Sequence, residues 1–245
     1  MSRRKVKHFK NFTEIIKVKE DESAATSHWK DEQDKLVISH IIKPRTKNQE
    51  RFINAILTNV ITIAEGPPGV GKTAIACGMA AKLLVEGKID KIILTRPQVE
   101  VGGVTQGYLP GSHVDKLVPY IAPMIDELKE FLGGKSVDNL IKREIINIVP
   151  LGLIRGKSPK GTFIIADESQ SMRYIEFKTL LTRIDLNSRL VLLADPSQSD
   201  LITGSRDFDT VCNKLYTLKD EIGFIKLDSS DCQRAGIVRK IIELL

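Results

Sequence analysis

The sequence predicts an α/β layer fold, built around a mostly parallel β-sheet with helices on both faces. Short runs of aliphatic and β-branched residues alternate along the chain with longer amphipathic segments, which is typical of this fold class. The runs are apolar throughout, rather than at every second residue, which indicates strands that are buried on both faces of a parallel sheet. We expect one domain, because the strand spacing leaves no room for a second sheet of equal size.

The predicted elements follow one another in a regular order after residue 35. Strands are expected over residues 60–64, 91–95, 145–149, 163–166, 189–194 and 224–227. Helices are expected between them, over residues 46–57, 72–86, 114–131, 174–182 and 207–216. Each strand is short and continuously apolar, whereas each helical segment is longer and has one apolar face.

The composition excludes several classes of protein. Hydrophobic residues make up 42% of the chain and charged residues 28%, which is ordinary for a globular protein and argues against wholesale disorder. No stretch approaches the roughly 18 apolar residues of a membrane span, so no membrane partner is expected. Neither a secretory signal nor a disulfide framework is visible, because no apolar run follows the N-terminal charges and the three cysteines lie far apart. A cytoplasmic location is therefore expected.

The net charge of the chain is concentrated near its N-terminus. Residues 1–19 hold seven basic side chains and one acidic side chain, which matches the formal charge of +6 for the whole chain. We therefore predict a flexible basic arm over residues 1–34 and a balanced α/β domain over residues 35–245. Two interpretations of the arm stay open: it lies along the phosphates of a nucleic acid, or it is a solvated terminus.

A phosphate-binding loop is predicted directly after the first strand. Residues 66–73 match G-x-x-x-x-G-K-[ST] at every fixed position, between an apolar strand and an Ala- and Leu-rich helix that ends at Gly87. In that context the glycines let successive N–H groups face a β-phosphate at the helix N-terminus, and an incidental glycine-rich turn is disfavoured. Lys72 is expected to reach the β- and γ-phosphate oxygens, and Thr73 to bind Mg²⁺. The expected ATP-binding residues of the loop are Gly66, Pro67, Pro68, Gly69, Val70, Gly71, Lys72 and Thr73.

Two acidic residues follow the apolar strand at residues 163–166. Ligands of open α/β sheets collect at the carboxyl ends of the strands, so Asp167 and Glu168 are expected beside the phosphate loop. Asp167 would hold Mg²⁺ through water, and Glu168 would polarise the attacking water. The long separation between Lys72 and Asp167 favours an NTPase over a kinase that acts on a small molecule.

Two glutamines are further candidates for nucleotide contacts. Gln198 follows the strand at 189–194 and Asp195, where it suits a sensor of the γ-phosphate. The alternative is a solvated glutamine in an Asp-Pro-Ser turn. Gln49 opens a helix about 20 residues before the phosphate loop, and its amide has the donor and acceptor needed to read an adenine edge. An exposed helix position is the alternative for Gln49.

Three arginines are candidates for binding phosphate groups. Arg96 follows the strand at 91–95 and is predicted to bind a nucleic-acid phosphodiester, but an ion pair with Glu168 or Glu100 is equally favoured. Arg234 follows the last strand and is a candidate arginine finger for the γ-phosphate, in cis or from a neighbouring subunit. Arg239 competes for that role, and a simple helix-terminus arginine is the remaining alternative.

The order of these motifs resembles that of the PhoH-like ATPases, phosphate-starvation-inducible proteins that are also common in bacteriophages. The resemblance covers about residues 45–245, through the segments GPPGVGKT, KIILTRPQVEVGGVTQGYLPG, KLVPYIAPMIDEL, LGLIRGKSPKGTFIIADESQ, MRYIEFKTLLTRI and LVLLADPSQSDL. It implies a RecA-like P-loop NTPase domain that is similar to the first lobe of superfamily 1 helicases. It also implies that Asp167 and Glu168 form the acidic pair and that Gln198 is the sensor. Arg234 falls where the family has an arginine before a His-Pro-like segment, although Arg-Ala-Gly-Ile-Val stands here.

Together, the residues and the resemblance predict an Mg²⁺-dependent ATPase that couples hydrolysis to binding or remodelling RNA or another single-stranded nucleic acid. A nucleotide-gated binding module with little turnover is the alternative, which Glu168 and Gln198 disfavour. A phosphotransferase that acts on a small molecule is a third. A helicase needs two RecA-like lobes and one is visible here. We therefore expect a homo-oligomer, such as a ring, in which Arg234 or Arg239 acts in trans.

Overall fold

The computed structural model describes residues 36–97, 113–154, 161–185, 187–198 and 202–233. Its strands are β1 (Ile61–Glu65), β2 (Lys91–Thr95), β3 (Ile146–Ile148), β4 (Thr162–Ala166), β5 (Arg189–Ala194) and β6 (Ile222–Lys226). Its helices are α3 (Lys47–Thr58), α4 (Lys72–Val85), α5 (His113–Leu132), α6 (Gly134–Lys142), α7 (Tyr174–Leu181) and α8 (Ile202–Leu215). Short 3₁₀ turns include η4 (Ser169–Ser171), η5 (Pro196–Gln198) and η7 (Ser229–Asp231). The predicted basic arm at 1–34 lies outside the described residues.

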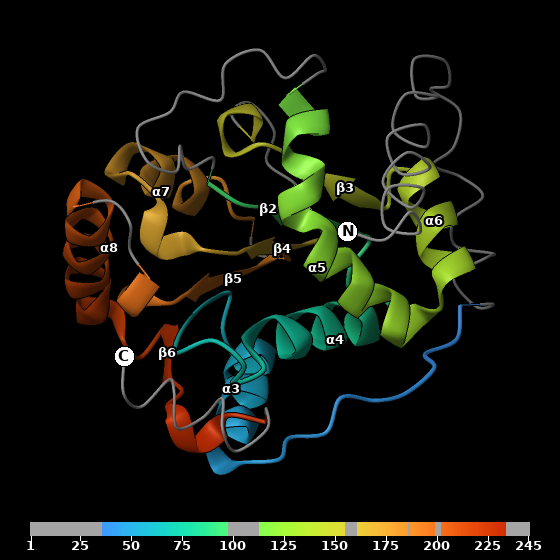
Figure 1. Ribbon diagram of the computed structural model, residues 1–245, viewed down its shortest axis with the longest axis horizontal. Helices are drawn as coiled ribbons and strands as arrows, with labels where there is room; N and C mark the ends of the chain where they lie inside the picture. The colour runs from blue at the N-terminus through green and yellow to red at the C-terminus, as the bar shows by residue number, and fades with distance from the viewer. Residues whose placement is uncertain (1–35, 98–112, 155–160, 186, 199–201, 234–245) are drawn as a thin grey trace, which may run out of the picture.

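The six strands form one sheet in the order β3-β2-β4-β5-β1-β6, and every neighbouring pair is parallel. All strands therefore end at the same edge of the sheet. The strand before the phosphate loop, β1, pairs with β5, and β5 pairs with β4. This order brings the segments that follow β1, β5 and β4 side by side, as Figure 1 shows.

Two hydrophobic cores cover the two faces of the sheet, because successive side chains of a strand point to opposite faces. On β1, Ala64 belongs to the core under α3, α4, α5 and α6, whereas Ile63 belongs to the core under α7 and α8. Figure 1 shows these two groups of helices on opposite sides of the sheet. The α/β layer fold predicted from the sequence, with helices on both faces, is confirmed.

Three elements differ from the prediction. Helix α6 was not expected, because it is short and begins within a Gly-Gly pair, but its apolar side packs on α5 and β3. Helix α8 begins at Ile202 rather than at 207, since a threonine and a glycine in its first turn give a weak helix signal. Strand β6 begins at Ile222 rather than at 224, and its Gly223 is required there. A Cβ on Gly223 would lie 2.9 Å from Ala55 Cβ of α3.

No helix within the described ranges combines the length and the apolar character that crossing a membrane requires.

The contact between α4 and α5 depends on a glycine. A methyl group at Gly78 would lie 2.8 Å from Phe131 Cζ and 2.9 Å from Ile42 Cβ; Phe131 is buried in the core, and Ile42 packs against it. We expect Gly78→Ala to lower the free energy of unfolding by about 1–3 kcal/mol, although alanine is the better helix former. Urea denaturation measures this change. Gly134→Ala is the matched control, because no atom lies within 4 Å of its added methyl group. Equal or greater stability of Gly78→Ala would contradict the proposed packing.

Candidate functional site

The phosphate loop joins β1 to α4 and has the backbone shape that its glycines permit. Gly69 and Gly71 have φ angles of 83° and 87°, in the left-handed region that other residues rarely adopt. A Cβ on Gly66 would lie 2.8 Å from the main chain of Leu227, which follows β6. Helix α4 begins immediately after Gly71, with no side-chain cap on its first N–H groups. These N–H groups are therefore available to an anion, as the loop motif predicts.

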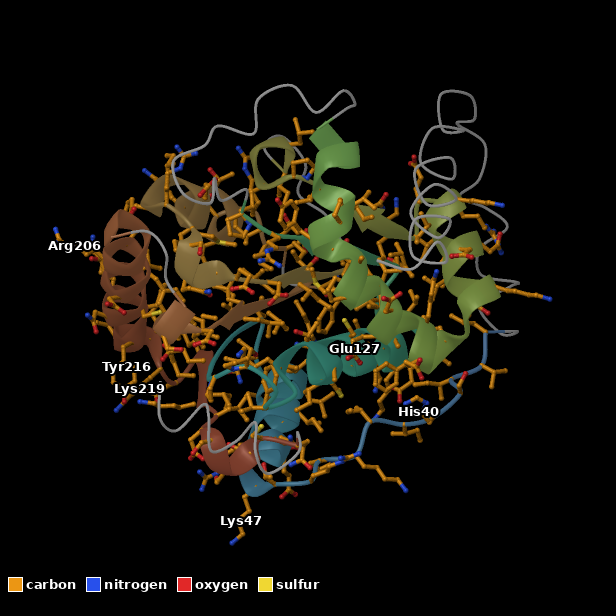
Figure 2. All side chains as sticks on the ribbon, in the orientation of Figure 1. His40, Lys47, Glu127, Arg206, Tyr216 and Lys219 are labelled. Carbon is orange, nitrogen blue, oxygen red and sulfur yellow. The ribbon has the colours of Figure 1, made fainter. Side chains whose placement is uncertain are left out.

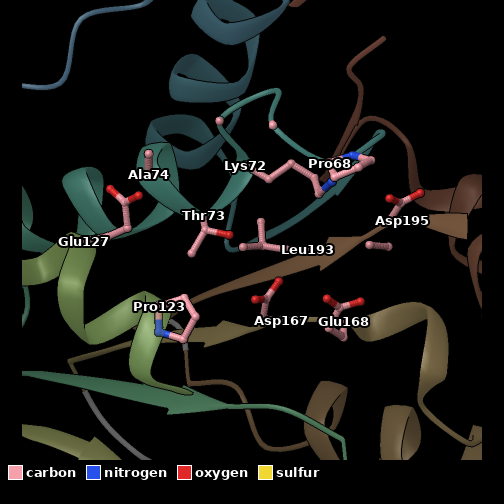
Figure 3. Close-up of a pocket in the computed structure, with 13 residues that line it drawn as sticks. Pro68, Lys72, Thr73, Ala74, Pro123, Glu127, Asp167, Glu168, Leu193 and Asp195 are labelled. Atoms are coloured by element: carbon pink, nitrogen blue, oxygen red, sulfur yellow. The ribbon is translucent and has the colours of Figure 1, made fainter. Parts of the chain in front are cut away.

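A cavity of about 400 Å³ lies at the carboxyl edge of the sheet, next to this loop. Its walls are the loop and first turn of α4, the residues that follow β4 and β5, and one side of α5 (Figure 3). Lys72, Thr73, Asp167 and Glu168 all line it. The structure thus brings together the predicted phosphate-binding and acidic residues, which lie far apart in the sequence.

The side chain of Lys72 is folded back onto its own loop. Its ammonium group donates hydrogen bonds to the carbonyl oxygens of Gly66 and Pro67, the latter at 2.9 Å. Burial lowers the pKa of Lys72, while the carboxylates of Asp195, Asp167 and Glu168 act in the opposite direction. A bound phosphate would therefore find the Lys72 ammonium group already in place. The ammonium group would give up its two carbonyl partners for the charged phosphate oxygens.

The cavity is strongly acidic. Among its described lining residues, Lys72 is accompanied by the carboxylates of Glu127, Asp167, Glu168 and Asp195. Burial raises the pKa of Asp167, the neighbouring Glu168 adds to this rise, and the cations Arg96 and Lys72 oppose it. The pKa of Glu127 is also raised, again mainly by burial. These groups repel one another and favour a bound cation.

The described residues contain no cluster of three metal-ligating side chains that would hold an ion by itself. Mg²⁺ is commonly held by one or two protein oxygens together with substrate phosphates and water. A hard cation also suits Asp195, which is buried and whose carboxylate oxygen Oδ2 has no hydrogen-bond partner among the described residues. Its other oxygen accepts hydrogen bonds from the Ser197 amide at 3.2 Å and hydroxyl at 2.5 Å.

Asp195 lines the cavity but was not among the predicted site residues. Its position directly after an apolar strand is the same signal that identified Asp167, and it follows the neighbouring strand of the sheet.

Glu168 is held in an unusual position by two side chains. Its backbone adopts φ 53° and ψ 39°, a left-handed conformation that costs free energy for a residue other than glycine. Its Oε2 accepts a 2.5 Å hydrogen bond from Gln170, and its Oε1 lies 3.5 Å from Arg96 Nη2. Of the alternatives for Arg96, the ion pair with Glu168 is formed here, Glu100 lies outside the described residues, and a phosphodiester contact stays a prediction.

Gln170 connects the two acidic strand ends, although no role was predicted for it. It is buried, it donates to Glu168, and its Oε1 accepts a 2.9 Å hydrogen bond from the Asp195 amide. The sequence contained a signal, because Gln170 closes the Asp-Glu-Ser-Gln segment after β4. Its partner Asp195 follows another strand, so the contact itself depends on the strand order.

Gln49 lies behind the phosphate loop and is buried, so the alternative of an exposed helix position was wrong. Its Nε2 donates to the Val70 carbonyl at 3.1 Å, and its Oε1 accepts from the Arg45 amide at 2.8 Å. The apolar pattern of α3 does not reveal this burial, because the partners are main-chain groups of another segment. Adenine recognition by Gln49 stays a prediction, and would use its second amide hydrogen and its second oxygen lone pair.

The segment after β6 is hydrogen bonded to the start of α3 and to the phosphate loop. Buried Asp231 accepts hydrogen bonds from the Thr46 hydroxyl and from Asn48 at 3.0 Å, both at the start of α3. The amide of Gln233 donates to the Gly69 carbonyl at 3.2 Å.

Arg234 and Arg239 lie outside the described residues, and so does the side chain of Gln198, whose backbone ends η5. Their assigned roles stay predictions.

The parallel sheet, the glycine-rich loop and the acidic cavity define a nucleotide-binding protein of the P-loop NTPase class. A family model described as PhoH-like protein matches residues 41–245. The chain belongs to this PhoH-like family, as the order of its motifs predicted.

Several curated relatives carry the same family name. The chain is 37% identical over 202 residues to a PhoH-like protein of Bacillus subtilis, covering 82% of this chain and 63% of that one. It is 32% identical to a PhoH-like protein of Synechocystis, with 83% and 62% covered, and 29% identical to Protein PhoH of Escherichia coli, with 82% and 57% covered. The chain thus spans roughly 60% of the length of these relatives.

Solved structures of more distant proteins also align with the chain. The UvsW helicase of bacteriophage T4 aligns at 13% identity and a TM-score of 0.46, covering 91% of this chain and 77% of that one. The Sulfolobus solfataricus SWI2/SNF2 ATPase core in complex with double-stranded DNA aligns at 13% identity and a TM-score of 0.46, covering 78% and 47%.

The buried carboxyl of Asp167 has a consequence for stability. Because its pKa is raised in the folded chain, folding favours the protonated form, and the ionised form costs stability above that pKa. Asp167→Asn is therefore expected to raise the free energy of unfolding at pH 7. The gain should shrink as the pH falls toward about 4, the ordinary value for aspartate. Urea denaturation across this pH range measures it, with Asp220→Asn as the control at an exposed carboxyl. A variant less stable than the wild type at pH 7 would contradict the account.

Proposed function

We propose that the protein is an Mg²⁺-dependent ATPase that couples hydrolysis to binding or remodelling RNA or another single-stranded nucleic acid. The observation that carries this proposal is the shared cavity of the phosphate loop, Lys72, Thr73 and the acidic pair Asp167 and Glu168. A protein that only binds phosphate has no need of a carboxylate beside the γ-phosphate position. The family name of the relatives is consistent with the proposal.

The binding step uses the main chain and one cation. The N–H groups of the loop and of the first turn of α4 would face the phosphates, where the helix N-terminus favours negative charge. Lys72 would leave the carbonyls of Gly66 and Pro67 for the β- and γ-phosphate oxygens. Burial keeps competing water away from this cation and strengthens its pairing with phosphate.

The hydrolytic step uses Glu168. The oxygen of a water molecule forms a bond to the γ-phosphorus while the bond from that phosphorus to the bridging oxygen of ADP breaks. The proton of the water passes to the Glu168 carboxylate, which lines the cavity. The unusual backbone conformation of Glu168 directs its side chain toward Arg96 and Gln170, at the margin of the cavity.

The donor set of the cavity fits Mg²⁺. Thr73 and Asp167 would hold the ion, since both supply oxygen atoms and both line the cavity. When bound, Mg²⁺ neutralises the charge that develops on the transferred phosphoryl group. Four carboxylates line the cavity, so a negatively charged triphosphate would need a cation beside it to bind there.

Four further side chains and the basic arm are proposed to contact the nucleotide or the nucleic acid. Gln198 is proposed as the γ-phosphate sensor, Gln49 as the adenine contact, Arg234 as the arginine finger and Arg96 as a nucleic-acid contact. For Arg234 the support is its chain neighbour, because Gln233 is hydrogen bonded to the loop residue Gly69. The basic arm at 1–34 is proposed to lie along nucleic-acid phosphates.

A nucleotide-gated binding module with little turnover is the second candidate. One observation favours it: both carboxylate oxygens of Glu168 are already engaged, one by Arg96 and one by Gln170. A glutamate held in this way does not accept a proton from water until one partner leaves.

Turnover assays separate the two candidates. Glu168→Gln is expected to keep ATP affinity but to lower kcat by about 10²–10⁴-fold, because the phosphate contacts remain while the water loses its proton acceptor. Lys72→Ala is expected to lose ATP binding itself. Phosphate release, measured with and without single-stranded RNA, gives kcat, and titration with a fluorescent ATP analogue gives affinity.

Glu221→Gln and Lys135→Ala are the matched controls, because both side chains are exposed and lie outside the cavity. Wild-type protein that binds ATP without releasing phosphate would overturn the ATPase proposal and support the binding module.

A homo-oligomer is proposed because a helicase-type nucleotide site is completed by a second lobe. The described residues form one such lobe, and a neighbouring copy would supply the second lobe with its arginine. Light scattering in the presence of a non-hydrolysable ATP analogue and Mg²⁺ is expected to show a mass above that of the 27.3 kDa monomer. A monomer at every concentration tested would contradict this assembly.

A further inference from the structure

Arg96 lies between the catalytic glutamate and an aromatic side chain. It follows β2, and its guanidinium contacts Glu168 Oε1 at 3.5 Å on one side. On the other side it lies 5.5 Å from the centroid of the Tyr120 ring, which belongs to α5. The Arg96 side chain is 26% exposed and Tyr120 is 38% exposed, so both are within reach of a ligand from solvent.

The two bonds that hold Glu168 differ in strength. Gln170 is buried and fixed at both ends, by Glu168 at 2.5 Å and by the Asp195 amide at 2.9 Å. The pair with Arg96 is longer and partly solvated, and ion pairs of this kind are weak. A competing anion would therefore displace the Arg96 contact and leave the Gln170 contact in place.

We propose that Arg96 is exchanged between Glu168 and a phosphodiester of a single-stranded nucleic acid, and that this exchange switches on hydrolysis. The inference rests on the ATPase function proposed above. When Arg96 turns to the phosphate, Glu168 Oε1 becomes free to accept the proton of the attacking water. Gln170 acts as a positioning residue, because it keeps the other carboxylate oxygen in place during the exchange.

Single-stranded nucleic acid is the ligand that this pair of side chains fits. A guanidinium binds phosphate oxygens through two parallel hydrogen bonds, which the single 3.5 Å contact with Glu168 does not provide. The exposed ring beside it offers a surface on which an unpaired base stacks. A paired duplex does not present its base faces to such a ring.

The backbone around Arg96 makes the exchange local. Strands β2 and β4 are neighbours, and the pairing continues past their ends, because the Asp167 amide donates to the Thr95 carbonyl at 3.1 Å. Arg96 and Glu168 each follow one of these two bonded residues. The backbone thus holds the two side chains next to each other, and movement of the Arg96 side chain is enough to break their contact.

Nucleic-acid affinity tests the exchange without any need for hydrolysis. The probe is a fluorescently labelled single-stranded oligouridylate, followed by anisotropy in the absence of nucleotide. Glu168→Gln removes the competing charge, and is expected to tighten binding about two- to fivefold, whereas Arg96→Ala weakens binding. In the double variant, Glu168→Gln should no longer tighten binding, since no guanidinium remains to be released.

A second ion pair of the chain provides the control. Arg173 Nη2 and Glu176 Oε1 are also 3.5 Å apart, but they lie at the start of α7, away from the cavity. Arg173→Ala and Glu176→Gln are expected to leave affinity unchanged. If Glu168→Gln fails to tighten binding, or tightens it equally in the Arg96→Ala background, the exchange is wrong.

The stacking role of Tyr120 has its own control. Tyr216 is an exposed tyrosine with Lys219 5.8 Å from its ring centroid, and Figure 2 shows this pair beside α8, near the β6 edge of the sheet. Tyr120→Ala is expected to weaken oligouridylate binding, while Tyr216→Ala does not. An oligodeoxynucleotide and inorganic polyphosphate, used as competitors, distinguish a phosphodiester contact with a stacked base from charge alone. Equal competition by polyphosphate would overturn the stacking part of the inference.

Turnover then tests the switch. Wild-type protein is expected to be slow alone and faster with oligouridylate, whereas Arg96→Ala is expected to turn over alone at about the stimulated rate and to respond no further. An Arg96→Ala variant that stays at the slow rate, beside a stimulated wild type, overturns the switch and leaves the ATPase proposal intact. An absence of turnover in every protein overturns the ATPase proposal itself, while the affinity measurements still decide whether Arg96 is exchanged.

Discussion

The parallel pairing of β4, β5 and β1 positions the whole site, because it makes three separate segments of the chain end at one edge of the sheet. Main-chain hydrogen bonds continue this order past the strands: Gly66 donates to Ala194 at 3.1 Å, and Asp167 donates to Thr95 at 3.1 Å. The phosphate loop and the acidic residues therefore begin at fixed points. Buried strands do not slide relative to one another without exposing their apolar side chains, so this geometry is stable.

The site contains buried ionisable groups whose charged forms are disfavoured by burial. Burial lowers the pKa of Lys72 and raises that of Asp167, so the cavity holds both ionic groups at a cost to the free protein. Nucleotide phosphates and a divalent cation would relieve that cost by supplying the missing partners. The proposed binding would therefore reduce an electrostatic cost that the free protein carries.

The surroundings of Glu168 link the cavity to the surface of the protein. Gln170 connects this glutamate to the end of β5, and Arg96 connects it to β2 and to Tyr120 of α5. A ligand that contacts Arg96 would therefore act on a carboxylate that lines the cavity of the phosphate loop. The segment after β6 adds a second connection, through Gln233 and Gly69, from the end of the described chain to the phosphate loop.

The sequence alone determined the fold class, the strand order along the chain, the loop at 66–73 and the acidic pair, because apolar runs and motif spacing are local properties. Only the tertiary structure decided which residues lie together. It placed Asp195 and Gln170 in the site, buried Gln49 behind the loop and paired Arg96 with Glu168. These contacts join segments that are distant in the chain, and their partners depend on how the parallel strands are ordered in space, which no local pattern records.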